Sequence, residues 1–195
     1  GLSFNDTITG GQAGAGYPPD TNGDVGPNHY IQAVNDSYAI YSKTGTLLAA
    51  FTENALWLGA QTGTPCDANN FGDPVVVYDA LADRWILTNF AFANSTTGPF
   101  FQCFAVSRSG DPVAGGWFLY AVRMDSGAIA AGTLNDYPKF GIWTDCLYMS
   151  ANEFKGNTYK GSAFASFERS SLYAGATLNS NNSSIGLVPF SNHTG

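Results

Sequence analysis

The sequence has few charged residues, and this shortage already excludes some partners. Charged residues make up 12% of the 195 residues, about half the share that is usual in globular proteins. The eight Lys and Arg are scattered singly among fifteen Asp and Glu. Binding to nucleic acid or to an anionic membrane surface needs clustered basic side chains, so we expect neither as a partner.

Long apolar runs and the residue spacings of zinc sites are also missing. No stretch approaches the ~20 apolar residues of a membrane span, so no membrane insertion is expected. The chain contains two histidines and no C-x-x-C pair, which argues against a structural zinc site. Its start at GLSFNDT suggests a mature or trimmed N-terminus, so a missing signal peptide does not argue against secretion.

Apolar residues are abundant by contrast. They make up 44% of the chain and aromatics 14%, enough for a substantial core. Helical periodicity is nearly absent, and most of the chain has the pattern of short strands between Gly, Pro, Asn and Asp clusters. Solubility then depends on Ser, Thr, Asn, Gln and Gly, as is typical of secreted β-rich proteins. These features predict a single all-β domain over residues 1–195.

Three sections of the chain resemble one another. Each opens on Gly or Asn followed by Asp and an apolar strand, then passes through polar residues into an aromatic-rich strand. The predicted units cover residues 23–60, 72–123 and 135–175, and residues 176–195 start a further strand or blade. Repeats of this length with about four strands are typical of β-propeller blades. Because propellers usually need about four to eight blades, we expect a partial propeller or a fragment of a longer one.

Four segments carry a resemblance to a known group of proteins. PPDTNGDVGPNHYIQAVN, GDPVVVYDALADRWILTNFA, CFAVSRSGDP and NDYPKFGIW together resemble a family of large secreted bacterial proteins with a propeller-like β domain. The resemblance covers residues 18–175. Members often carry immunoglobulin-like modules or a sorting signal further on, and most have no assigned activity. The resemblance therefore implies fold and an extracellular or cell-surface location, and no catalytic residue.

The cysteines and the glycosylation sequons also favour secretion. Of Cys66, Cys103 and Cys146, the first two flank the same β unit, which favours a Cys66–Cys103 disulfide; three buried free thiols are the alternative. N-x-S/T sequons are in mild excess. They occur at Asn5, Asn35, Asn94, Asn181, Asn182 and Asn192.

Asp20, Asn22 and Asp24 have the D-x-N-x-D spacing of a calcium loop. Calcium takes about six to eight oxygen ligands, so backbone carbonyls, water or a remote carboxylate would have to complete the site. The positions where an EF-hand needs glycine and an acid hold Val25 and Ile31, so this is no EF-hand. Calcium is the one cofactor that the sequence suggests, but we favour a strand-entry turn held by side-chain to backbone bonds.

Asp24, Asp73 and Asp136 each precede an apolar strand in one unit. In a propeller they would meet near the axis, where crowded carboxylates could act as the acid and base of a glycosidase. The alternative is that each aspartate accepts hydrogen bonds from backbone N–H groups at a strand start. In YDALADRW, Arg84 is expected to pair with Asp79 or Asp83, and an exposed Trp85 would offer a sugar platform.

These observations favour a secreted or cell-surface binding or structural module without catalysis. It would recognise glycans or proteins or associate with itself. Two alternatives stay open: a glycoside hydrolase or lyase that uses the funnel carboxylates, and a subunit of an extracellular assembly whose unfinished blade is completed by a neighbour.

Overall fold

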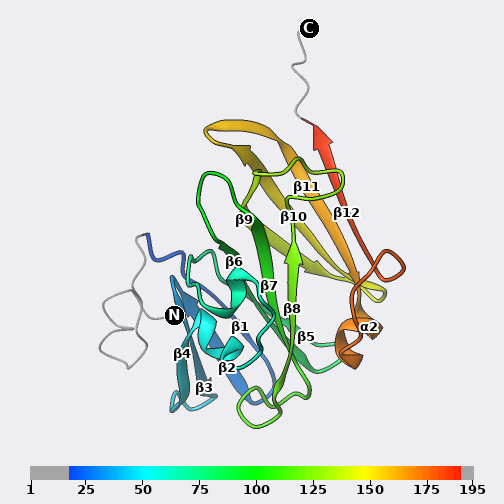
Figure 1. Cartoon of the computed structure of the whole chain (residues 1–195). Coiled ribbons are helices and arrows are strands. Elements are labelled where there is room, and N and C mark those ends of the chain that lie inside the picture. The colour runs from blue at the N-terminus through cyan, green and yellow to red at the C-terminus, as the bar shows by residue number, and fades with distance from the viewer. Residues whose placement is uncertain (1–17, 190–195) are drawn as a thin grey trace, which may run out of the picture.

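The computed structural model describes residues 18–189 and contains three four-stranded antiparallel sheets (Figure 1). The first comprises β1 (Asn22–Val25), β2 (His29–Val34), β3 (Ser37–Ser42) and β4 (Leu47–Thr52). The second comprises β5 (Val75–Asp79), β6 (Arg84–Phe92), β7 (Phe100–Ser107) and β8 (Trp117–Arg123). The third comprises β9 (Leu134–Ile142), β10 (Cys146–Lys155), β11 (Thr158–Glu168) and β12 (Ser183–Pro189). The all-β prediction is confirmed.

Strand β6 shows why the second sheet lies between the other two. Trp85 and Leu87 pack with the core of the first sheet around Ile31, whereas Ile86 packs with Leu147 of the third sheet. Successive side chains of a strand point to opposite faces, so the apolar run from Trp85 to Leu87 must be covered on both sides. Trp85 is fully buried in this way and cannot act as an exposed sugar platform.

The first strands of the three sheets lie together, because β5 contacts both β1 and β9. Asn22 Oδ1 accepts the Val76 N–H at 2.8 Å, and Asp24 Oδ2 accepts the Tyr78 N–H at 2.8 Å. β5 is an edge strand, whose outer N–H groups need acceptors from elsewhere. Alternate residues of β1 point to the same side and meet alternate N–H groups of β5.

The predicted strand-entry turn is therefore wrong for residues 22–25, which form β1 and pair with β2. The Asn-x-Asp spacing reflects the two-residue period of a strand that bonds to a neighbouring sheet edge.

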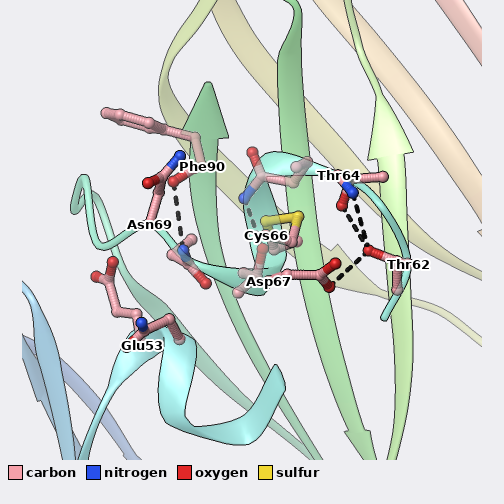
Figure 2. The surroundings of a disulfide bond; sticks show 12 residues. Glu53, Thr62, Thr64, Cys66, Asp67, Asn69 and Phe90 are labelled. Carbon is pink, nitrogen blue, oxygen red and sulfur yellow. Dashed lines mark hydrogen bonds between the residues drawn. A yellow bond between two sulfur atoms is a disulfide. The ribbon is translucent and has the colours of Figure 1, made fainter. Parts of the chain in front are cut away.

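The structure contains the predicted disulfide between Cys66 and Cys103, with a Cα–Cα distance of 5.8 Å. Cys66 lies in the short 3-10 helix η2 (Pro65–Asp67), beside an Asp67 side chain that accepts a hydrogen bond from Thr62 at 2.7 Å (Figure 2). The disulfide links the segment between β4 and β5, which contains η2 and the preceding helix η1 (Glu53–Trp57), to the second sheet. Cys146 is a free thiol at the start of β10.

The predicted pairing of Arg84 is wrong. Its guanidinium donates to the carbonyls of Ala82 and Asp83, within its own turn. Asp79 instead pairs with Arg169 of helix α2 (Arg169–Ala174), with 2.7 Å between Nη2 and Oδ2. This contact joins the second sheet to the third, and local sequence spacing could not have indicated it.

The third sheet extends further along the chain than the repeat unit predicted for it. Its fourth strand, β12, comes from the stretch in which the sequence indicated the start of another strand or blade. One face of this sheet leaves Tyr148 and Phe164 exposed. Over residues 18–189, no helix is long and apolar enough to cross a membrane.

Candidate functional site

Three residues at or just before β1, β5 and β9, the first strand of each sheet, adopt left-handed backbone conformations. Asp20 and Asp73 each lie two residues before a first strand, with φ of 41° and 49°, and Tyr137 of β9 has φ of 52°. Such φ values are uncommon outside glycine and concentrate at functional sites. All three side chains line one cavity of about 200 Å³. We call it the axial pocket, lined by Asp20, Thr21, Asn22, Asp73, Pro74, Val75, Tyr137, Pro138 and Lys139.

A β-bulge places Tyr137 in this pocket. The ladder between β9 and β10 passes from Lys139 directly to Asp136, so Tyr137 and Pro138 oppose a single residue of β10. A bulge of this kind redirects side chains and is often found beside functional sites. The pairs Asp73-Pro74 and Tyr137-Pro138 are the sequence signal that could have aligned these two positions.

The predicted trio of Asp24, Asp73 and Asp136 is corrected accordingly. Asp73 lines the axial pocket, but Asp24 bonds to the backbone of β5 and does not line it. Asp136 lies next to Tyr137 and is close enough to Asp73 to influence its charge. Asp20 takes the position expected for Asp24, because Asp20 shares the left-handed backbone of Asp73.

Asn35, between β2 and β3, connects the three sheets at this pocket. Its Nδ2 donates to Asp20 Oδ2 at 2.9 Å, and its Oδ1 accepts the Asp73 N–H at 2.9 Å. Asp73 Oδ2 in turn accepts the Tyr137 N–H at 3.1 Å. Gly72 permits this approach, because a Cβ there would lie 2.7 Å from Asn35 Oδ1. One amide thus holds the Asp20 carboxyl and the Asp73 backbone together at the pocket.

This role conflicts with the predicted glycan on Asn35. The residue is 7% exposed, and its Nδ2 also donates to the Pro18 carbonyl, so the folded chain leaves no room for a sugar there. Asn94 and Asn181 are exposed, and Asn182 is partly buried. The predicted sequons Asn5 and Asn192 lie outside the described residues.

Burial raises the pKa of the Asp73 carboxyl to about 6. The hydrogen bond from the Tyr137 N–H opposes this shift, whereas the negative charges of Asp136 and Asp20 add to it and Lys139 lowers the pKa. The carboxyl group is therefore partly protonated near neutral pH, as a proton donor requires.

Glu53 bonds to the backbone of Gly72, the residue before Asp73 of the pocket. It begins η1 (Figure 2) and is 1% exposed. Its Oε2 accepts the Gly72 N–H at 3.2 Å. Burial raises the pKa of Glu53 to about 8, and the nearby Asp36 and Asp73 contribute to the shift. No sequence pattern marked Glu53, because it enters the site through a 3-10 turn with no counterpart in the other two repeats.

Lys139 and Tyr137 form the exposed side of the pocket. The Lys139 ammonium lies 3.2 Å from the centroid of the Tyr137 ring, a cation–π contact that orients both side chains. Together with Asp20, Asn22 and Asp73, they offer hydroxyl, amide, carboxyl and ammonium groups around a small cavity. This mixture suits a ligand that is rich in hydroxyl groups.

The predicted calcium ligands are all engaged in hydrogen bonds. Asp20 accepts from Asn35, Asn22 from Val76 and Asp24 from Tyr78. Within residues 18–189, no group of three or more His, Cys, Asp or Glu residues is arranged to hold a metal ion. Calcium binding stays a prediction.

Replacing Asn35 with alanine should destabilise the chain by about 1–3 kcal/mol, because it removes the partners of the Asp73 N–H and of Asp20. The Asp73 carboxyl should also titrate at a changed pH. Urea unfolding measures the first effect and carboxyl ¹³C NMR the second. Asn28→Ala, an exposed turn substitution, is the control. An unchanged titration of Asp73 in Asn35→Ala would contradict the positioning role.

Comparisons with known proteins leave the family open. No protein-family model and no curated protein matches the sequence. A structural match is the GH43 endo-arabinanase from Bacillus licheniformis, with a TM-score of 0.46 and 12% sequence identity. The match covers 87% of this chain and 56% of that one, so the chain spans little more than half its length.

Proposed function

We propose that the chain is a carbohydrate-active domain whose axial pocket binds one sugar unit and hydrolyses the adjoining glycosidic bond. The carrying observation is the Asp73 carboxyl, with its pKa raised to about 6, facing the same cavity as Asp20. Glycosidases use one carboxyl group to protonate the leaving oxygen and a second to act on the anomeric carbon or on water. We therefore favour a glycoside hydrolase over a binding module without catalysis.

In the proposed mechanism, Asp73 is the general acid. Its Oδ2 is held by the Tyr137 N–H, so Oδ1 is the atom that would present the proton to the glycosidic oxygen. Asp20, whose Oδ2 is held by Asn35, would use its other oxygen as base or nucleophile. Asn35 bonds to the Asp20 carboxyl and to the Asp73 backbone N–H, and Tyr137 N–H holds the Asp73 carboxyl, which limits the reorganisation needed in the transition state.

We also propose a propeller-like fold and an extracellular location for the chain. Three four-stranded sheets that stack face to face, with their first strands together, are consistent with three blades of a propeller. We propose that the three sheets are blades of a partial propeller. The disulfide favours an oxidising compartment, and thus a secreted or cell-surface protein.

A non-catalytic glycan-binding module is the second candidate. It is favoured by the engagement of Asp24, Asn22 and one Asp73 oxygen in backbone hydrogen bonds, since such bonds also serve structure alone. Protein partners, and completion of an assembly by a second copy, stay predictions.

Asp73→Asn should lower the hydrolysis of a susceptible glycan by at least about 10²-fold, because the amide has no acidic proton to donate. In the wild type, activity should fall as pH rises through about 6, where Asp73 loses its proton. The substitution is tested with reducing-sugar release from a panel of neutral polysaccharides. Asp111→Asn, in an exposed turn distant from the pocket, is the matched control. Glycan binding without hydrolysis by the wild type would establish the binding module instead.

A further inference from the structure

A second cavity adjoins the axial pocket. It has a volume of about 140 Å³ and lies on the exposed face of the third sheet. Its lining residues are Tyr137, Lys139, Ser150, Ala151, Asn152 and Ser162. Tyr137 and Lys139 line both cavities and form the wall between them.

We propose that this second cavity is a further sugar-binding subsite, so that the ligand is a neutral oligosaccharide or polysaccharide chain that crosses Tyr137 and Lys139. The inference rests on the proposed function, since it extends a chain whose first unit occupies the axial pocket. At about 200 and 140 Å³, each cavity is smaller than the ~300 Å³ at which ligand pockets usually begin. Two small linked cavities suit consecutive units of one chain better than one bulky ligand.

Strand register brings the polar lining residues of the subsite to one face. Ser150 of β10 pairs directly with Lys139 of β9, and Asn152 pairs with Asp136 on one side and Ser162 on the other. Side chains of directly opposed residues share a face of the sheet. Ser150 and Asn152 make no side-chain hydrogen bond with any described residue. Their hydroxyl and amide groups can therefore bind the hydroxyl groups of a sugar.

The wall between the cavities offers an aromatic ring. Tyr137 is 58% exposed, and Lys139 is exposed beside it. An aromatic ring combines a large apolar face with a polar tip, which suits the apolar face and ring hydroxyls of a sugar. Beyond Ser150, its partner Phe164 on β11 is 50% exposed and continues this face.

Charge selects a neutral chain. Asp20, Asp73 and Asp136 lie at or beside the axial pocket, and the chain carries a net charge of −7. An anionic sugar in the first cavity would be repelled by this field, and among residues 18–189 Lys139 is the one basic residue that lines either cavity. Uronic acid polymers are therefore expected to bind more weakly than neutral glycans.

The test measures affinity against ligand length. Cello-, xylo-, manno- and arabino-oligosaccharides of one to six units are titrated calorimetrically against wild type and variants. For the series that binds, affinity should rise about tenfold between one unit and three. Asn152→Ala should remove most of this gain, and Ser150→Trp, which fills the cavity, should abolish it. Neither variant should change binding of the single unit, and Asn28→Ala should behave as wild type.

The outcomes separate the two proposals. If single units and longer chains bind wild type equally while hydrolysis continues, the subsite is overturned and the proposed function stands. If Asn152→Ala and Ser150→Trp both keep the gain with length, the extra units bind elsewhere and the subsite is again overturned. If no glycan of any length binds or is cleaved, both proposals fail. Stronger binding of oligogalacturonate than of neutral chains would overturn the neutral-ligand assignment.

Discussion

Replacing Arg169 with methionine is expected to destabilise the folded chain by about 3–5 kcal/mol. Asp79 has no exposed side-chain surface, and Arg169 Nε and Nη2 donate to its Oδ2 at 2.8 and 2.7 Å. The Tyr173 hydroxyl donates to the same oxygen. Removal of the guanidinium leaves a buried carboxylate whose charge is no longer compensated, and this is the costly way to break a buried ion pair.

Urea unfolding at pH 7 measures this effect, with Arg84→Met as the matched control. Arg84 donates only to carbonyls of its own turn, so the control should cost less than about 1 kcal/mol. Adding Asp79→Asn to Arg169→Met should recover much of the loss, because the buried charge is removed. A loss below about 1 kcal/mol in Arg169→Met would show that the contact does not hold the second and third sheets together.

Replacing Glu153 with glutamine is expected to stabilise the chain by about 3–5 kcal/mol at pH 8 and to have little effect near pH 5. Glu153 of β10 has no exposed surface, and both of its carboxyl oxygens lack a partner within residues 18–189. It lies opposite Asn135, whose Oδ1 is also unpartnered. The two Glu153 oxygens and Asn135 Oδ1 are three buried acceptors without a donor. They indicate that Glu153 is held as the neutral acid, whose O–H group can donate a hydrogen bond.

The sign of the pH dependence follows from the pKa values. Burial, with a contribution from Asp125, raises the pKa of Glu153 from 4.5 to about 8 in the folded chain. Between these values the folded state binds more protons than the unfolded state, so stability falls as pH rises from 4.5 to 8. Glu53, with its pKa also raised to about 8, contributes in the same direction. Glutamine carries no charge to desolvate, so Glu153→Gln should lose less stability over this range.

Thermal unfolding between pH 5 and 8 tests this expectation. Wild type should lose stability across the range, and the difference between Glu153→Gln and wild type should grow with pH. Glu168→Gln, at the exposed end of β11, is the control and should follow the wild-type slope. If Glu153→Gln and wild type run parallel from pH 5 to 8, the carboxyl is ionised throughout or solvated, and the neutral-acid interpretation is wrong.

The segment at residues 18–25 has partners that its own sequence does not indicate. In PPDTNGDV the spacing of Asp20, Asn22 and Asp24 by itself allows either a calcium loop or a turn. Their actual partners are the Val76 and Tyr78 N–H groups and Asn35, which the fold brings from 15 to 54 residues away. A one-dimensional pattern carries no information on such partners, so it predicts Asp24 at the pocket that Asp20 lines in the structure.

Sequence alone determined the features that depend on local periodicity and composition. Alternating apolar residues, with Gly, Pro and Asn in the turns between them, specify strands. A strand that is apolar on both faces has to be covered by two layers. The disulfide between Cys66 and Cys103 also depends on positions close in the sequence, since Cys66 precedes the second unit and Cys103 lies within it. Tertiary structure alone decided the site, because a bulge at Tyr137, a buried amide at Asn35 and a 3-10 turn at Glu53 act together only after three sheets have packed.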